Sequence, residues 1–271
     1  MDDILRKQFI KKTFDTVAPG YDKPALRFFQ QSVEKLPLYF AFKGHEQVLD
    51  AATGTGVAAL NLASALAEGK VIGVDMSEGM LAQAQSKAVR EGFHNVDFVA
   101  MDIEDLQFSE NAFDHINCSF GLFFVEDMKA LLGQLVTKLK PGGKFISCCF
   151  SDEAFQPHAD LFYDRIVGYG VEIPAVLGFK RLADEEKSTA LYESVGLKSI
   201  KTYRHHVSFL QKDANEWWDV LWYAGFRGFL DQLDASALKA FKREHLKEIS
   251  ELPTDVGIDF KVEVIFTVGE K

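Results

Sequence analysis

The chain has 271 residues, of which 47% are hydrophobic, and its net charge at pH 7 is -10. This is long and apolar enough for one domain with a full core, and the acidic balance without any Lys/Arg-rich stretch argues against a nucleic-acid substrate. The three cysteines lack zinc or disulfide spacing, no apolar run reaches a membrane-span length, and no secretory signal begins the chain. We therefore expect a soluble, cytoplasmic protein.

Residues 1–42 predict a helical cover, and residues 43–150 predict alternating strands and helices. The cover has apolar side chains at helical spacing over 2–17, the breaker Ala18-Pro19-Gly20, and a second helix over 25–42 interrupted at Pro37. The alternating part predicts strands at 47–51, 70–75, 96–100, 114–119 and 144–150, and helices at 57–68, 77–90 and 128–139. This alternation is typical of a Rossmann-like, doubly wound α/β sheet of parallel strands with helices on both faces.

After residue 150 the pattern predicts helices at 154–168 and 184–195 and strands at 198–209 and 260–268. Residues 211–256 lie between these strands and are too many for a hairpin. Their helical pattern predicts a cap inserted into what we expect to be a single domain over residues 1–271.

The most informative stretch is Val48-Leu49-Asp50-Ala51-Ala52-Thr53-Gly54-Thr55-Gly56, in which an apolar strand enters a glycine turn and leaves as an alanine-rich helix. Gly54 and Gly56 permit positive φ and place no Cβ between backbone and ligand. Asp75 ends the next strand, so in a parallel sheet its carboxylate lies beside the turn and can accept from both ribose hydroxyls. The pattern predicts a nucleoside cofactor but leaves NAD open, because Gly54-x-Gly56-x-x-Ala59 also fits the dinucleotide fingerprint.

Other features favour a different adenosine cofactor. These are Asp50 before the turn, the start of the motif nearly fifty residues into the chain, and Leu139-Lys140-Pro141-Gly142-Gly143-Lys144-Phe145 downstream. Together they resemble the class I S-adenosylmethionine-dependent methyltransferases, most closely the branch with the ubiquinone and menaquinone biosynthesis C-methyltransferases. The resemblance covers about residues 10–150. It implies a seven-stranded, mostly parallel sheet with one antiparallel strand, and S-adenosylmethionine as the methyl donor, with S-adenosylhomocysteine as product.

The resemblance also implies which residues hold the methionine and ribose parts of the donor. Asp50, Ala52, Gly54 and Gly56 would line the methionine end, and Asp75 would hold the ribose. Ala52 replaces the first glycine of the usual Asp-x-Gly-x-Gly-x-Gly pattern, as it does in the quinone methyltransferases. This departure favours a subgroup of the family.

The same resemblance assigns the remaining donor contacts. Met76 would lie against the adenine, with Ile103 beside the ring, and Asp102 would accept from the adenine amino group. Ser119, at the end of the fourth strand, would lie near the donor, and Tyr21 would close over it. For Asp102 the alternative is an acid that caps a loop or helix.

The cap and the fourth strand supply the candidates for the acceptor side. Trp218, Trp222 and Phe226 fall at four-residue steps on one helical face, with Arg227 beside them, and Phe120 follows the fourth strand. Such a stripe is more often core than pocket, but a cap packed over the donor would offer flat apolar walls. We therefore expect a small, aromatic or partly apolar acceptor. Arg227 would meet an acidic group of it or else lie in solvent.

The chemistry beyond donor binding is less defined. His158, His205 and His206 are candidates for a general base, although each is more often incidental, and none of the histidines has metal-ligand spacing, so no metal is predicted. The acceptor atom and the oligomeric state stay open. Two alternative functions also stay open: an NAD(P)-dependent oxidoreductase built on the same turn, and a protein that binds S-adenosylmethionine without turnover.

Overall fold

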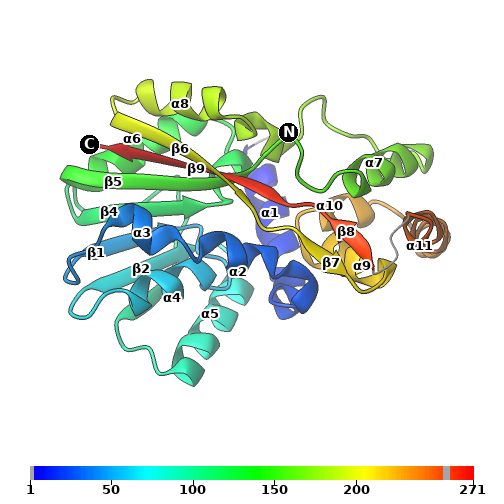
Figure 1. Ribbon diagram of the computed structural model, residues 1–271, viewed down its shortest axis with the longest axis horizontal. Helices are drawn as coiled ribbons and strands as arrows, with labels where there is room; N and C mark the ends of the chain where they lie inside the picture. The colour runs from blue at the N-terminus through cyan, green and yellow to red at the C-terminus, as the bar shows by residue number, and fades with distance from the viewer. Residues whose placement is uncertain (1–2, 253–256) are drawn as a thin grey trace.

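The computed structural model describes residues 3–252 and 257–271. Its centre is a seven-stranded sheet in the order β3-β2-β1-β4-β5-β9-β6, with helices around it (Figure 1). The strands are β1 (Gln47–Ala51), β2 (Lys70–Asp75), β3 (Val96–Ala100), β4 (Phe113–Ser119), β5 (Leu139–Phe150), β6 (Lys198–His206) and β9 (Glu263–Glu270). The first five pair in parallel, and β9 runs antiparallel to both β5 and β6. The predicted sheet with one antiparallel strand is confirmed.

The strand register brings the predicted motifs to one edge of the sheet. On β1, Asp50 pairs with Gly73 of β2 and with Asn117 of β4. The chain passes from β1 outward to β3 and then returns to β4 on the other side of β1. The carboxyl ends of β1, β2 and β4 therefore meet at a topological switch point, which is where open α/β sheets bind their ligands.

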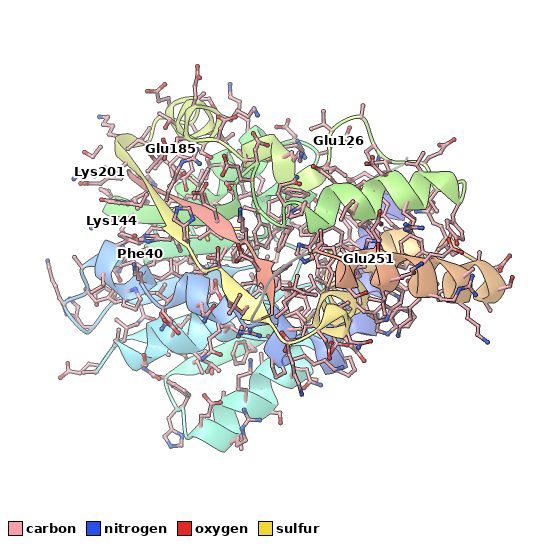
Figure 2. The ribbon with its side chains drawn as sticks, turned by 45° about the vertical axis from the view of Figure 1, so that its right-hand side comes forward. Phe40, Glu126, Lys144, Glu185, Lys201 and Glu251 are labelled. Carbon is pink, nitrogen blue, oxygen red and sulfur yellow. The ribbon has the colours of Figure 1, made fainter. Side chains whose placement is uncertain are left out.

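Helices connect these strands and cover the sheet. They are α1 (Asp3–Val17), α2 (Phe28–Val33), α3 (Leu36–Phe40), α4 (Val57–Ser64), α5 (Glu78–Glu91), α6 (Met128–Lys138) and α8 (Glu185–Glu193), with the short 3-10 turns η1 (Ala18–Gly20), η2 (Pro24–Leu26), η3 (Leu122–Phe124) and η4 (Gly178–Leu182). The predicted caps of α5 are present: Ser77 Oγ accepts from Met80 N, and Gly92 ends the helix with φ +76. Lys144 of β5 donates to the Phe40 carbonyl at 3.2 Å, which holds α3 against the sheet (Figure 2).

Several predicted boundaries are wrong in the first half. The helix expected over 25–42 is divided into η2, α2 and α3, and Pro37 lies in the first turn of α3, where its missing N–H has no intrahelical acceptor. The helix expected over 57–68 ends at Ser64. β5 begins at Leu139, because the Pro-Gly-Gly segment forms an irregularity within the strand between the pairs Phe113 with Leu139 and His115 with Lys144.

Part of the chain after β5 forms the cap, which lies beyond the carboxyl edge of the sheet at the right of Figure 1. It contains α7 (His158–Gly168), α9 (Ala214–Tyr223), α10 (Arg227–Leu230) and α11 (Ala235–Ser250), with β7 (Phe209–Gln211) and β8 (Ile258–Phe260) as a separate two-stranded sheet. The strand expected over 198–209 therefore ends at His206, and the one expected over 260–268 is divided between β8 and β9. Residues 211–252 are mainly helical, as expected, and 253–256 lie outside the described residues.

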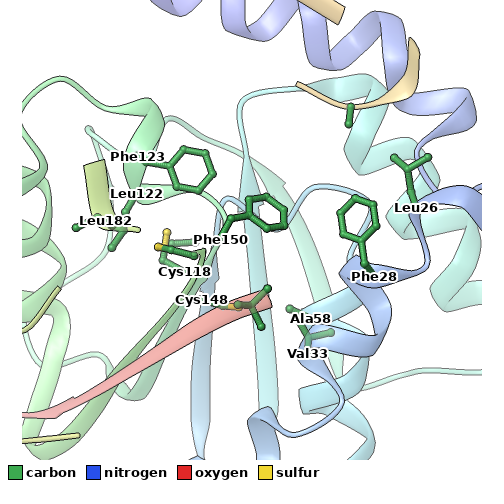
Figure 3. Packing of buried hydrophobic residues seen from close by; sticks show 14 of the residues in the cluster. Leu26, Phe28, Val33, Ala58, Cys118, Leu122, Phe123, Cys148, Phe150 and Leu182 are labelled. Carbon is green, nitrogen blue, oxygen red and sulfur yellow. The ribbon is translucent and has the colours of Figure 1, made fainter. Parts of the chain in front are cut away.

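A continuous aromatic core joins the sheet, the N-terminal cover and the cap. At the end of β5, the Phe150 ring lies 5.9 Å from that of Phe28 in α2 and 4.7 Å from that of Phe155, which precedes α7 (Figure 3). In the cap, the fully buried Trp217 donates its indole N–H to His245 Nε2 at 2.8 Å. In the part of the chain that the structure describes, no helix has the length and apolarity to cross a bilayer.

Candidate functional site

Two adjoining cavities open at the carboxyl edge of the sheet. The first, here called the glycine-turn cavity, has a volume of about 130 Å³ and is lined by residues of the turn after β1 and of the ends of β2 and β4. The second, the phenylalanine cavity, has a volume of about 560 Å³ and is lined mainly by aromatic side chains of the sheet edge, the cover and the cap. Among the predicted donor-binding residues, eight line the glycine-turn cavity: Tyr21, Asp50, Ala52, Gly54, Asp75, Met76, Ile103 and Ser119.

The glycine turn leaves free space on its cavity side. Gly54 has φ +55, and a Cβ built on it would meet no atom within 4 Å. Gly56, with φ +78, does not line the cavity and instead faces the neighbouring elements. A Cβ there would lie 2.9 Å from both Ala84 and Phe98. Its role is therefore to let the start of α4 pack closely on α5 and β3.

Gly121 makes room for Ala52, which stands where the usual pattern has its first glycine. Ala52 adopts φ +59, a left-handed conformation that costs roughly 1–2 kcal/mol for a residue with a Cβ. A Cβ on Gly121 would lie 2.7 Å from the Ala52 methyl group. Gly121 therefore leaves the room that the alanine occupies.

Asp75 is anchored by backbone donors and keeps acceptor capacity. Gly54 N donates to Asp75 Oδ2 and Ser77 N donates to Asp75 Oδ1, both at 2.9 Å. Burial raises the pKa of the Asp75 carboxyl above its ordinary value, although these backbone bonds oppose the rise. A carboxylate has about four lone-pair sites, so two are left for the hydroxyls of a ligand.

Asp50 is buried at the end of β1 with two hydrogen bonds to its carboxylate. Thr53 Oγ1 donates to Oδ2 and Asn117 Nδ2 donates to Oδ1, each at 2.6 Å. Burial raises the pKa of Asp50 to about 6, and the two bonds moderate the rise. The glycine-turn cavity therefore carries an additional negative charge at neutral pH and above.

The N-terminal helix α1 covers the glycine-turn cavity through ion pairs and lining residues that were not predicted from the sequence. Lys7 of α1 forms an ion pair with Asp102 at 2.9 Å, and Arg6 forms one with Glu104, also at 2.9 Å. Asp102 also accepts from Glu104 N and does not line the cavity, whereas the adjacent Ile103 does. The missed lining residues of α1 are Arg6, Ile10 and Phe14. Nothing in the sequence indicates that Arg6 and Lys7 pair with Asp102 and Glu104, because the two segments are about a hundred residues apart.

An aromatic wall separates the two cavities. Phe14, Tyr21, Phe29, Phe120 and Phe124 line both of them. Tyr21 stacks on Phe29 with ring centroids 5.0 Å apart, and burial raises the pKa of its hydroxyl. Phe120 has φ +59, a strained conformation for a bulky residue, and its N–H donates to the Cys148 carbonyl at 2.7 Å. Backbone strain of this kind is concentrated at functional sites.

The predicted cap residues divide between the lining of the phenylalanine cavity and the packing of the cap itself. Phe226 lines the phenylalanine cavity, but Trp218, Trp222 and Arg227 do not. The prediction that Phe226 shares a helical face with Trp218 and Trp222 is wrong, because α9 ends at Tyr223 and Ala224 is extended. Trp218 stacks on Trp222 at 5.8 Å, and the Arg227 guanidinium lies 3.7 Å from the centre of the Trp222 ring.

The three candidate histidines line neither cavity. His158 is fully buried in the cap, 5.3 Å from the rings of both Trp217 and Phe260, and burial lowers its pKa to about 4. His205, on the edge strand β6, contacts Tyr39 and Lys35. His206 lies next to it and pairs with Glu263 at 3.2 Å. None of the three is placed to take a proton from a molecule in either cavity.

Comparison with known proteins gives matches in sequence and in fold. Residues 48–143 match a family described as "Methyltransferase domain". A ubiquinone/menaquinone biosynthesis C-methyltransferase of Bdellovibrio bacteriovorus is 34% identical over 141 residues, which are 51% of this chain and 60% of that protein. A demethylmenaquinone methyltransferase of Bacteroides fragilis is 30% identical over 173 residues, covering 61% of this chain and 71% of that protein.

The fold comparison extends over more of the chain. A phosphoethanolamine N-methyltransferase 2 of Haemonchus contortus, solved with phosphomonomethylethanolamine and S-adenosylhomocysteine, has a TM-score of 0.61 at 18% identity. It covers 98% of this chain and 60% of its own. The matched segments span 60, 64 and 61% of the first three curated relatives. The family match therefore lies within the glycine-turn half of the chain, whereas the fold comparison takes in nearly the whole chain.

Proposed function

Because the chain belongs to the class I S-adenosylmethionine-dependent methyltransferases, we propose that it transfers the methyl group of S-adenosylmethionine to a small, aromatic or partly apolar acceptor. The comparisons support neither an NAD(P)-dependent oxidoreductase nor a binding protein without turnover. We propose the glycine-turn cavity as the donor site and the phenylalanine cavity as the acceptor site.

In this proposal the polar groups of the glycine-turn cavity hold the donor. The free space over Gly54 would take the methionine end, and the two remaining acceptor sites of Asp75 would take the ribose hydroxyls. Met76 and Ile103 would enclose the adenine. Asp50 and Ser119 would lie near the methionine end. The Asp50 charge favours a cationic sulfonium there over a neutral sulfur. For Asp102 we propose a positioning role, which is supported by its ion pair with Lys7 of α1.

The observation that carries the proposal is the aromatic wall common to both cavities. Because these side chains line both cavities, a donor in one and an acceptor in the other would come into direct contact beside Tyr21, Phe29 and Phe120. The bound donor supplies an electrophilic methyl group on a sulfonium. The chain supplies alignment and a dry contact region, and holding two reactants in line can contribute on the order of 7–11 kcal/mol.

The composition of the phenylalanine cavity supports an apolar, flat acceptor. Rings from the sheet edge, the cover and the cap surround it, among them Phe28, Phe150, Phe155 and Phe229. The Bacteroides fragilis relative is by name a methyltransferase of demethylmenaquinone, and a flat acceptor of this kind would suit these walls. We propose residues 211–256 as the cap that encloses this acceptor.

The donor site is tested by calorimetry with S-adenosylmethionine and S-adenosylhomocysteine. Gly54→Val would fill the free space of the turn and should abolish binding of both. Gly142→Val is the matched control, because Gly142 also has positive φ and open space around a built Cβ but lies in β5, away from both cavities. Asp75→Ala should also abolish binding. Equal binding by Gly54→Val and Gly142→Val would contradict the assignment of the donor site.

A further inference from the structure

The phenylalanine cavity contains few polar side chains, and they differ in position. Among the described residues that line it, the polar side chains are Tyr21, Tyr163, Glu172 and Gln232. Tyr21 belongs to the wall common with the glycine-turn cavity, and Glu172 and Gln232 are exposed. Tyr163 is therefore the polar group within the aromatic part of this cavity.

The ring of Tyr163 is fixed by packing. It lies on α7, with its centroid 5.7 Å from that of Phe229 in an edge contact and 6.0 Å from that of Phe226. Both partners line the same cavity. The position of the hydroxyl relative to the cavity walls is therefore set before any ligand enters.

The hydroxyl of Tyr163 has unused hydrogen-bonding capacity. Among residues 3–252 and 257–271, no hydrogen bond to its Oη is found, whereas Tyr169 at the end of the same helix donates to Glu244 at 2.7 Å. Burial raises the pKa of Tyr163 above its ordinary value, so the phenol keeps its proton and remains a donor. Tyr163 is only partly buried, so its hydroxyl can be reached from the cavity, and an oxygen atom of a ligand can take the place of water as its acceptor.

We propose that Tyr163 determines acceptor specificity by donating a hydrogen bond to an oxygen on the acceptor ring, such as a hydroxyl, ether or carbonyl oxygen. The acceptor class is then an aromatic molecule with an oxygen substituent, whose remaining surface packs on the phenylalanines. This inference rests on the proposed function, since it concerns the acceptor site of the same reaction. It adds the chemical group by which that site distinguishes one flat apolar molecule from another.

The test compares three probes with the same naphthalene rings and different oxygen substituents. Naphthalene has none, 2-methoxynaphthalene has an oxygen that only accepts, and 2-naphthol has one that accepts and donates. Each is titrated by calorimetry into the protein saturated with S-adenosylhomocysteine. The variants are Tyr163→Phe and the matched control Tyr169→Phe, which removes a hydroxyl of the same helix outside the cavity.

The wild type and Tyr169→Phe should bind both oxygen-bearing probes about fivefold more tightly than naphthalene. Tyr163→Phe should bind the three probes about equally, with unchanged affinity for S-adenosylhomocysteine. The inference is overturned if Tyr163→Phe keeps the wild-type preference, or if the wild type binds no probe. In those cases intact S-adenosylhomocysteine binding would leave the proposed donor function standing, whereas its absence in the wild type would overturn that function itself.

Discussion

The burial of Asp50 predicts that the stability of the protein falls as the pH rises through a defined range. In the folded chain the pKa of this carboxyl is about 6, compared with an ordinary value of 3.8. A raised folded pKa means that the folded state binds the proton more tightly than the unfolded state does. The contribution of the protonated Asp50 carboxyl to the free energy of unfolding is therefore fully present below about pH 4. It is lost as the pH rises through about 6.

The magnitude follows from the difference between the two pKa values. About 1.4 kcal/mol corresponds to each unit, so an ionised Asp50 lowers the free energy of unfolding by about 3 kcal/mol at pH 7.5 relative to pH 4. Asp50→Asn removes this dependence and keeps the shape. Its amide oxygen can accept from Asn117, and its NH₂ group can donate to Thr53, whose hydroxyl can rotate to accept.

The assay is urea unfolding, followed by circular dichroism at several pH values from 4.5 to 7.5. The difference in unfolding free energy between Asp50→Asn and the wild type should increase with pH in favour of the variant, because the other titrating groups cancel. Asp114→Asn is the control: the pKa of Asp114 is lowered, with bonds from Lys140 and Gln47 N outweighing desolvation, so its difference from the wild type should stay flat over this range. Parallel stability curves for Asp50→Asn and the wild type would refute the reasoning.

Two further predictions concern packing. Gly121→Ala places a methyl group 2.7 Å from the Ala52 Cβ and should lower the free energy of unfolding by about 2 kcal/mol. The double variant with Ala52→Gly should recover part of the loss in urea unfolding, since the added methyl would still lie 2.9 Å from Cys118 Sγ, and additive losses would contradict a direct clash with Ala52. Trp217→Phe leaves His245 Nε2 buried without its donor and should cost about 2 kcal/mol. The partly exposed Trp222→Phe should cost much less, and equal losses for the two would argue against this hydrogen bond.

The parts of the fold that sequence could predict are those with strong local signals. The apolar strands before Gly54 and Asp75 and the two caps of α5 depend on neighbouring residues only, and all are present as expected. The proposed donor residues Ala52, Gly54, Asp75, Met76 and Ser119 could likewise be expected at one edge of the sheet, because they lie at or just after strand ends. Parallel pairing then brings those ends together.

The parts that sequence could not predict depend on contacts between distant segments. The ion pair of Lys7 with Asp102 closes α1 over the glycine-turn cavity, but nothing in either segment alone indicates the other. The periodicity of 218–226 does not reveal that the helix ends before Phe226, where an extended Ala224 redirects the ring into the phenylalanine cavity. β7 and β8 are three residues each, and besides pairing with one another they depend on distant segments: Arg27 donates to the Leu210 carbonyl, and Phe260 packs on Trp217.

The place of β9 in the sheet also constrains how a growing chain can fold. β9 lies between β5 and β6, yet it is made after both, and the part of the cap from β7 to β8 separates it from β6. During synthesis the strands β1 to β5 can pair as they leave the ribosome, whereas β6 has no neighbour until β9 emerges. Until then β5 and β6 present unpaired backbone groups that can recruit foreign strands. A translational pause within the cap segment would prolong this vulnerable stage, and a pause after β9 would not.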